Sequence, residues 1–199
     1  MQSEWLAASY ERFWRPIAFA LSTGLGAPSA EDEARLALRL LADRKGPWLD
    51  LSCGPGTLTR HLVRAAKQRT VFGLDSSRAM LARARYAAPD AVLVRADAAS
   101  LPFDDCVFGA IVNMAALDLY PDPSSVVAEA ARVLAHGGRW VCSTFVTKAG
   151  VPRKSPVIPL SGVRTPSLEE LAGWAAHAGL ARFDKLPFRR YVIAWADKD

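Results

Sequence analysis

Short apolar runs alternate with amphipathic segments along most of this chain. Five runs have the length of buried strands: one begins at Trp48, and the others cover residues 71–75, 91–97, 107–114 and 140–146. We expect a helix after each of the first three runs. Such alternation predicts parallel strands joined by right-handed crossovers. The pattern therefore predicts an α/β protein with a doubly wound sheet.

Further elements are expected towards both ends of the chain. They are helices over residues 3–20, from Pro28 or Ser29 to Asp43, over 124–135 and over 167–179, and a pair of strands over 180–186 and 189–195. Gly137-Gly138 and Gly179 stand where the last two helices should stop. Ser167, followed three residues later by Glu170, has the pattern of a capped helix start.

The composition fits one soluble, cytoplasmic domain. The chain has 199 residues, of which 51% are hydrophobic, enough for a substantial core. No apolar run approaches the roughly 20 residues of a membrane span, and the N-terminus lacks a signal-peptide pattern. The three cysteines, Cys53, Cys106 and Cys142, do not have the spacing of metal ligands, so no metal site is predicted.

The formal net charge is +5, and most of the basic residues are arginines on expected helix faces, where solvated charge is the usual explanation. A nucleic-acid partner is not expected, because no basic stripe interleaved with aromatic residues is present. A denser basic group, Lys148, Arg153, Lys154 and Arg164, flanks a proline-rich connection that could meet an acidic substrate or an anionic surface.

Acidic residues end three successive strands, and a glycine-rich turn follows the first. Asp50, Asp75 and Asp97 should lie side by side, because the carboxyl ends of parallel strands share one edge of the sheet. Asp50 suits a ligand with positive charge, and Asp75 could accept from both hydroxyls of a ribose. Asp97 could accept from an exocyclic amine such as that of adenine. Each acid could instead cap a helix or a turn.

Four stretches carry a resemblance to a known family: Leu49–Thr57, Gly73–Leu81, Arg95–Phe103 and Arg132–Arg139. Together they resemble the class I S-adenosylmethionine (SAM)-dependent methyltransferases, of the small-molecule type that is similar to quinone-biosynthesis methyltransferases. Ser52 departs from the pattern, since the family usually has its first glycine there. The resemblance implies a Rossmann-like sheet of seven strands, mostly parallel with an antiparallel last strand.

The resemblance also implies one methyltransferase domain over residues 1–199. Residues 1–45 would form N-terminal helices that cap the site. Residues 46–146 would be the SAM-binding core. Residues 147–199 would supply a short connection, the last helix and the terminal strand pair. Because the connection after the fifth strand is short, a small organic acceptor is expected rather than a folded macromolecule.

The family pattern implies SAM as the cofactor. Its contacts would come from Asp50, Ser52, Gly54, Gly56, Asp75, Ser76, Met80, Asp97, Ala98 and Asn113. Gly54 and Gly56 would let the backbone approach the methionine part without a Cβ in the way. Met80 would flank the adenine or else pack as plain helix core. Ala98 would offer its backbone N–H to the adenine.

The acceptor site is less defined. Tyr10, Trp14 and Tyr120 are candidate acceptor contacts, although the two N-terminal aromatics could equally pack their helix onto the domain. Methyl transfer depends mainly on alignment of the two reactants. If the acceptor must lose a proton, Asp118 is the candidate base; its other interpretation is a cap on the loop before Pro121. The three histidines are interpreted as surface or packing residues.

The sequence therefore predicts a SAM-dependent methyltransferase for a small organic acceptor. The choice between O-, N- and C-methylation stays open, as does the oligomeric state. One alternative is a non-catalytic SAM-binding partner or scaffold protein of the same fold. A nicotinamide-dependent oxidoreductase is disfavoured, because Thr59 stands where that class needs its third glycine.

Overall fold

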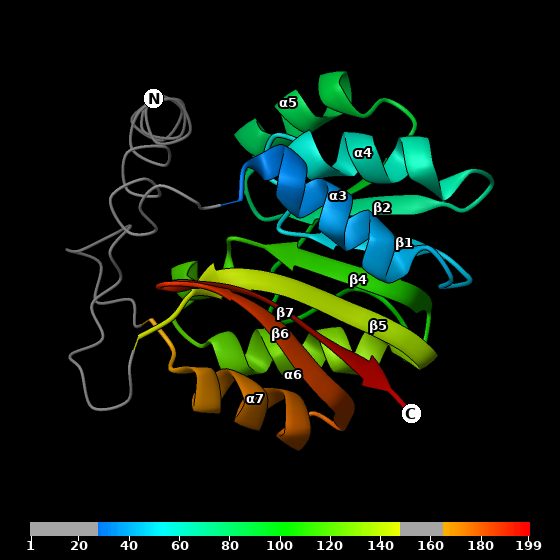
Figure 1. Cartoon of the computed structure of the whole chain (residues 1–199). Helices are drawn as coiled ribbons and strands as arrows, with labels where there is room; N and C mark the ends of the chain where they lie inside the picture. The colour runs from blue at the N-terminus through cyan, green and yellow to red at the C-terminus, as the bar shows by residue number, and fades with distance from the viewer. Residues whose placement is uncertain (1–27, 148–164) are drawn as a thin grey trace.

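A computed structural model describes residues 28–147 and 165–199 of the chain (Figure 1). The expected helix over residues 3–20, with Tyr10 and Trp14, lies outside the described residues. So does the basic group around residues 148–164. The structure therefore leaves the expectations for these two segments as predictions.

Seven strands form one sheet in the order β3-β2-β1-β4-β5-β7-β6. Their bounds are β1 Trp48–Leu51, β2 Val71–Asp75, β3 Val92–Arg95, β4 Phe108–Met114, β5 Leu134–Phe145, β6 Leu180–Phe188 and β7 Tyr191–Lys198. The pairs among β3, β2, β1, β4 and β5 are parallel, whereas β7 is antiparallel to both β5 and β6. This arrangement confirms the predicted seven-stranded sheet with its antiparallel last strand.

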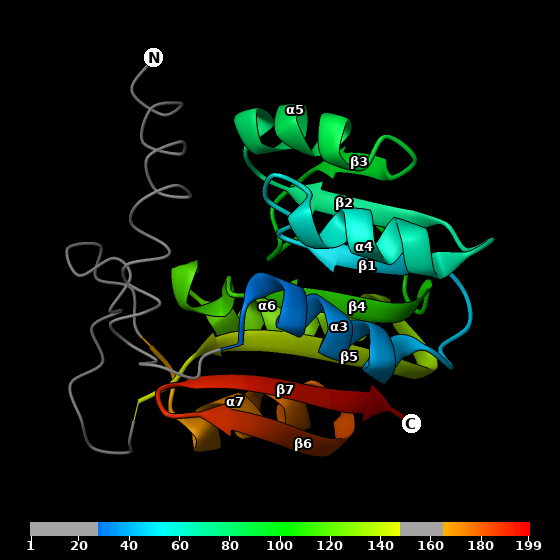
Figure 2. The ribbon, with the colours of Figure 1, turned by 45° about the horizontal axis from the view of Figure 1, so that its top comes forward.

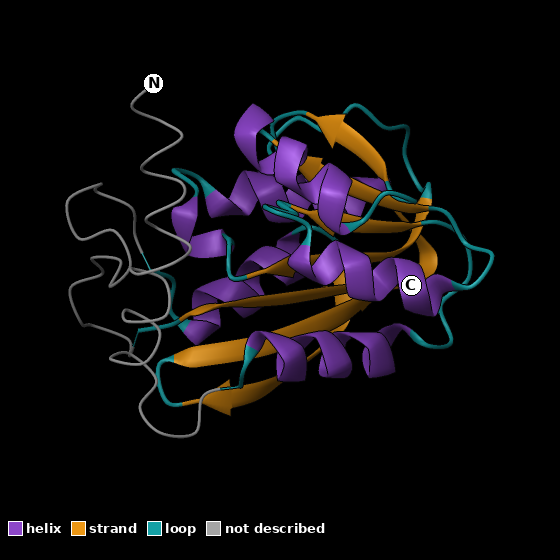
Figure 3. Ribbon diagram, turned by 90° about the horizontal axis from the view of Figure 1, so that it is seen from above, coloured by secondary structure: helices purple, strands orange, loops and turns teal. Residues whose placement is uncertain are grey.

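Helices cover both faces of the sheet (Figures 1 and 2). Their bounds are α3 Ala30–Leu41, α4 Thr57–Ala66, α5 Arg78–Ala87, α6 Pro123–Val133 and α7 Leu168–His177, with a 3₁₀ turn, η2, at Leu117–Leu119. Helices α3, α4 and α5 pack in a row, and α6 packs against α7. The view from above in Figure 3 shows the sheet between these helices. Among the described residues, no helix is long and apolar enough to cross a membrane.

The protein has two hydrophobic cores, one on each face of the sheet, and strand β1 contributes to both. All four residues of β1 are buried. Leu49 and Leu51 face the core with α6 and α7, and Trp48 faces the core with α3 and α4. Side chains alternate along a strand, so Asp50 lies on the same face as Trp48, towards α4. The polar end of an otherwise apolar strand is thereby placed under the N-terminus of a helix.

The predicted helix after the third strand is wrong, because residues 96–107 form turns instead. Arg132 of α6 donates to the carbonyls of Leu101 (3.1 Å) and Phe103 (2.9 Å), and Glu129 accepts from the backbone N–H of Leu101 (2.7 Å). Phe103 packs edge-to-face on Phe72 and Phe108. Side chains of α6 therefore satisfy backbone groups that a helix would have paired internally.

The helix predicted over 124–135 ends two residues earlier than expected, at Val133. Leu134 is extended and fully buried, and it pairs with Phe108 as the first residue of β5. The ladder then shifts its register before Ala110 pairs with Arg139. Gly137, with φ +72°, lies within this irregular start of β5 rather than at a helix end.

Candidate cofactor pocket

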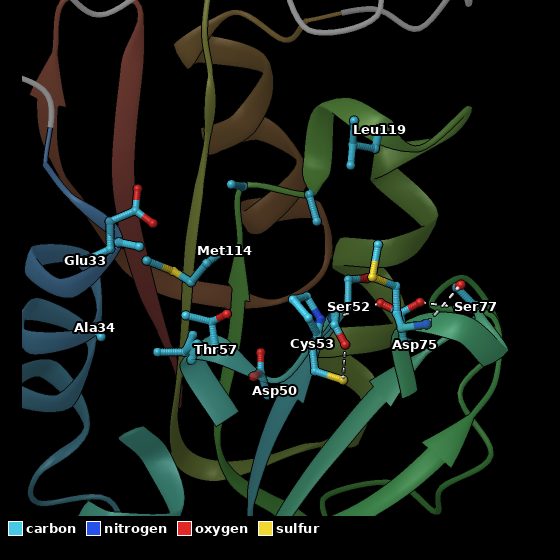
Figure 4. A pocket seen from close by; sticks show the side chains of 17 residues that line it. Glu33, Ala34, Asp50, Ser52, Cys53, Thr57, Asp75, Ser77, Met114 and Leu119 are labelled. Atoms are coloured by element: carbon cyan, nitrogen blue, oxygen red, sulfur yellow. Dashed lines mark hydrogen bonds between the residues drawn. The ribbon is translucent and has the colours of Figure 1, made fainter. Parts of the chain in front are cut away.

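A cavity of about 310 Å³ opens at the carboxyl ends of β1, β2 and β4. This is the point where the strand order reverses, and ligands of open α/β sheets bind there. The glycine-rich turn, the first residues of α4 and α5 and the segment after β4 form its walls, and the first turn of α3 closes one side (Figure 4). Of the predicted cofactor residues, Asp50, Ser52, Gly54, Asp75 and Met80 line it.

The turn from Ser52 to Gly56 is held in left-handed backbone conformations. Ser52, Gly54 and Gly56 have φ values of 64°, 53° and 82°. A Cβ on Gly56 would lie 2.8 Å from Ala84 Cα, so this glycine allows α4 to pack closely on α5. A Cβ on Gly54 would meet nothing within 4 Å, since Gly54 faces the open pocket. The two glycines therefore have different roles, one in packing and one in leaving room for a ligand.

Asp75 ties the glycine-rich turn to the end of β2. One carboxylate oxygen accepts from the backbone N–H of Gly54 at 2.9 Å, and the other accepts from that of Ser77 at 2.8 Å. A carboxylate has about four acceptor positions, so two backbone bonds leave capacity for two ligand hydroxyls. The ribose contact of Asp75 stays a prediction, for which this capacity is available.

Asp50 is 2% exposed, and Thr59 donates to it at 2.6 Å. The pKa of Asp50 is raised to about 7, mainly by burial; the Thr59 hydrogen bond opposes this rise and the charge of Asp75 adds to it. Among the described residues that line the pocket, none is a lysine, arginine or histidine. A buried carboxylate without a cationic neighbour favours a ligand that brings positive charge.

Glu33 of α3 is a third acid in the pocket, and it was not predicted. It is 5% exposed and accepts a hydrogen bond from the Tyr191 hydroxyl of β7. That hydroxyl also lies 2.7 Å from Ser143 Oγ, which accepts from the backbone N–H of Ala115. The sequence held one signal: Glu33 shares a helix face with the buried Ala37 and Leu41, at intervals of four residues.

Ser52, which lines the pocket, shares a hydrogen bond between side chains with Tyr120, which is not among the lining residues. Burial raises the pKa of the Tyr120 phenol. Ser52, at the position where the resembling family has glycine, thus connects the glycine-rich turn to the segment after β4. The predicted acceptor contact Tyr120 is bonded to a predicted cofactor residue.

The other predicted residues lie around the pocket rather than on its walls. Asn113 is fully buried and donates to the Leu51 carbonyl at 2.8 Å. Asp97 is exposed and accepts from the backbone N–H of Ala99 at 2.9 Å, whereas Ala98 is buried. Ser76 is exposed, and its neighbour Ser77 lines the pocket and caps α5.

The candidate base Asp118 is 1% exposed and accepts from Thr144 Oγ1 of β5 at 3.4 Å. It belongs to η2, behind the pocket wall that Ala116 and Leu119 form. The structure therefore brings Asp50, Asp75 and Glu33 to one cavity and leaves Asp118 beside it. No cluster with the makeup of a metal site occurs among the residues that the structure describes.

Comparison with known proteins shows which family this chain is similar to. Residues 49–142 match the family described as "Methyltransferase domain". An uncharacterized chloroplastic methyltransferase of Arabidopsis thaliana is 34% identical over 160 residues, which are 75% of this chain and 43% of that protein. The phthiotriol/phenolphthiotriol dimycocerosates methyltransferase of Mycobacterium tuberculosis is 38% identical over 92 residues, covering 45% of this chain and 34% of that protein.

The chain thus spans less than half the length of these curated relatives. The Arabidopsis relative is named chloroplastic, and the expected cytoplasmic location of this chain stays a prediction.

Among solved structures, the geranyl diphosphate C-methyltransferase of Streptomyces coelicolor, in complex with S-adenosyl-L-homocysteine, geranyl diphosphate and Mg²⁺, superposes with a TM-score of 0.71. It is 19% identical, and the match covers 85% of this chain and 77% of that one. Residues 49–142 of the chain thus match the methyltransferase domain family, and the sheet around them has the fold of a SAM-dependent methyltransferase.

Proposed function

We propose that the chain transfers a methyl group from SAM to a small organic acceptor. The charge of the pocket carries this proposal. Asp50 and Asp75 line the pocket, and none of the described residues that line it is a lysine, arginine or histidine. SAM brings a sulfonium and an ammonium, whereas a dinucleotide would bring a pyrophosphate that these two carboxylates would repel. The proposal therefore favours SAM over a nicotinamide cofactor.

Residues of the chain have distinct roles in this proposal. Asp50 faces the ammonium, and Asp75 accepts from the ribose hydroxyls while it holds the Gly54 backbone in place. Met80, one turn into α5, lies against the adenine. Asp97, Ala98, Asn113 and Ser76 remain proposed contacts. The bound cofactor supplies an electrophilic methyl group, and the chain aligns the acceptor with it, a type of effect that contributes roughly 7–11 kcal/mol at most.

The acceptor wall is apolar in the part that the structure describes. Met114, Ala115, Ala116 and Leu119, from the end of β4 and the segment after it, form this wall. An acceptor with an apolar body fits such a surface. The Streptomyces neighbour was solved with geranyl diphosphate, a small organic molecule, and we extend that class of acceptor to this chain. The proposal assigns no general base, and that role for Asp118 stays a prediction.

The test is product formation. The purified chain is incubated with SAM and a panel of phenols, quinones, amines and carboxylic acids, and methylated products are detected by mass spectrometry. Methylation of a panel member that is lost in Asp75→Ala supports the proposal. Tight binding of S-adenosylhomocysteine without any product across the panel would instead favour the non-catalytic SAM-binding partner.

A further inference from the structure

The outer surface of α4 and α5 is strongly cationic. Six exposed basic residues lie on these helices or directly after them: Arg60, Arg64, Lys67, Arg78, Arg83 and Arg85. Residues 57–70 and 78–87 contain no aspartate or glutamate. The two helices lie side by side and contact each other (Figures 1 and 2), and their combined outer surface with these six residues is here called the α4–α5 face.

Several arginines elsewhere in the described structure are paired with acids, whereas others, such as Arg39 and Arg190, form no ion pair within the described ranges. Arg35 contacts Glu31 and Asp32, and Arg132 and Arg139 form ion pairs with Glu129 and Asp197. Within the described ranges, the six cations of the α4–α5 face form no ion pair. The α4–α5 face therefore gathers six exposed cations that no acid within the described ranges offsets.

The spacing of these residues follows the helix axes. Arg60, Arg64 and Lys67 are separated by four and three residues, so they form one stripe along α4 and its end. Arg78 and Arg85 are seven residues apart and form a second stripe on α5. Neighbouring cations at these spacings repel one another, which is a cost that an anionic partner would remove.

Exposed apolar groups border the same face. Tyr86, the residue after Arg85, is 89% exposed, and Val92 at the start of the edge strand β3 is 44% exposed. Within the described residues, the other large hydrophobic side chain this exposed is Leu186, on β6. A tyrosine and an aliphatic side chain beside several basic residues are typical of a surface that lies on lipid headgroups. Single-stranded nucleic acids bind platforms of several aromatic residues, whereas Tyr86 stands alone.

We propose that the α4–α5 face docks the protein on an anionic lipid surface. The affinity of a basic segment for an anionic lipid surface rises roughly fivefold with each cation that contacts the surface. The α4–α5 face lies beside the pocket. Ser77, which lines the pocket, is the neighbour of Arg78, and Thr57, which also lines it, lies one turn before Arg60. Docking would bring the pocket entrance close to the bilayer surface. This surface is distinct from the pocket acids on which the proposed function depends.

The test is sedimentation of the full chain with vesicles of phosphatidylcholine, with and without phosphatidylglycerol. We expect binding only to the anionic vesicles and release at high salt, because counterions screen exposed charges within about 10 Å at 0.1 M. Arg64→Glu with Arg83→Glu should weaken this binding at least tenfold. Arg35→Glu with Arg39→Glu is the matched control: it makes the same charge change on exposed positions of α3 and should bind nearly as the unaltered chain does.

Three results would overturn the docking proposal. They are equal binding to neutral and anionic vesicles, equal weakening by both pairs of substitutions, and binding to poly(U) or duplex DNA at a salt concentration that abolishes vesicle binding. Arg64→Gln with Arg83→Gln replaces the first pair if its thermal unfolding differs from that of the unaltered chain. Binding of S-adenosylhomocysteine is measured on all variants, and its absence would count against the proposed function alone.

Discussion

At the scale of single residues, Asp50 constrains the ligand most strongly. Its carboxylate is buried at the end of β1, with one hydrogen bond from Thr59 and with Asp75 near enough to raise its pKa. An ionised group in this position is costly until a cation arrives. The same residue that is unfavourable for the empty protein is therefore favourable for binding an ammonium.

Because ionised Asp50 is unfavourable in the empty protein and favourable with a bound ammonium, both stability and ligand affinity should depend on pH. Its pKa of about 7 lies above the ordinary value of 3.8, so between these values the folded protein binds more protons than the unfolded chain. Stability of the ligand-free protein should therefore fall as the pH rises from about 4 to about 7. Affinity for S-adenosylhomocysteine should rise over the upper part of this range, because an ammonium pairs with the ionised form.

Urea unfolding and calorimetric titration across this pH range test both slopes. Asp50→Asn removes the titrating group, and it should flatten both slopes, stabilise the empty protein above pH 7 and weaken ligand binding. Slopes that persist unchanged in Asp50→Asn would show that another group is responsible.

Alanine substitutions at Gly54 and Gly56 should differ in how much they destabilise the fold. Gly56→Ala should destabilise the fold by about 2–4 kcal/mol, because a left-handed residue is strained and its Cβ would press on the Ala84 backbone. Gly54→Ala should cost only about 1–2 kcal/mol from backbone strain, since its Cβ meets open space. Its larger effect should be on binding of S-adenosylhomocysteine. Urea unfolding of both variants checks the order, and equal losses would contradict it.

At the scale of elements, the sequence predicted those that local pattern controls. The apolar runs placed the strands, and Ser29 and Ser167 both form capping boxes at helix starts. The turns after β3 depend on Arg132 and Glu129, which lie about thirty residues away along the chain. Leu134 begins a strand because its partner Phe108 is available. No local pattern contains these two contacts.

Arg132 gives the prediction at this scale. It is about one-third exposed, and its guanidinium bonds two loop carbonyls and the carboxylates of Glu129 and Asp105. Arg132→Ala should reduce the free energy of unfolding by about 2–3 kcal/mol, because it leaves these partners without a donor. Arg35→Ala is the control, whose exposed pairs should contribute less than about 1 kcal/mol. Similar losses in urea unfolding for both variants would contradict the role given to Arg132.

The candidate site was predictable to the extent that strand ends determine it. Asp50, Asp75 and Gly54 follow directly from the edge of a parallel sheet, and the structure brings all three to one cavity. Glu33 enters from a helix whose docking against β7 no strand pattern specifies. Asp118 follows the right strand, but η2 turns its carboxylate towards Thr144. The position of Asp118 outside the pocket lining and the presence of Glu33 within it both depend on tertiary packing, and the role of Asp118 as a base stays a prediction.

At the scale of the whole molecule, acidic and basic groups gather in two different places. Carboxylates gather at the carboxyl ends of its strands, where the strand order reverses. Cations that form no ion pair with another described residue gather on the outer surface of α4 and α5. The net charge of +5 is an average over the whole chain, and it hides both the acidic pocket and the basic α4–α5 face. A cationic cofactor and an anionic surface would each meet the part of the molecule with the opposite charge.

Calorimetric titration with S-adenosylhomocysteine tests the central claim most directly. The unaltered chain should bind it, and Asp75→Ala should weaken binding by roughly 1–3 kcal/mol, or about 5- to 150-fold, because the ribose hydroxyls lose their acceptor. Asp90→Ala is the matched control: it removes an exposed carboxylate outside the pocket and should leave the affinity unchanged. No binding by the folded chain, or equal affinity in Asp75→Ala, would contradict the account.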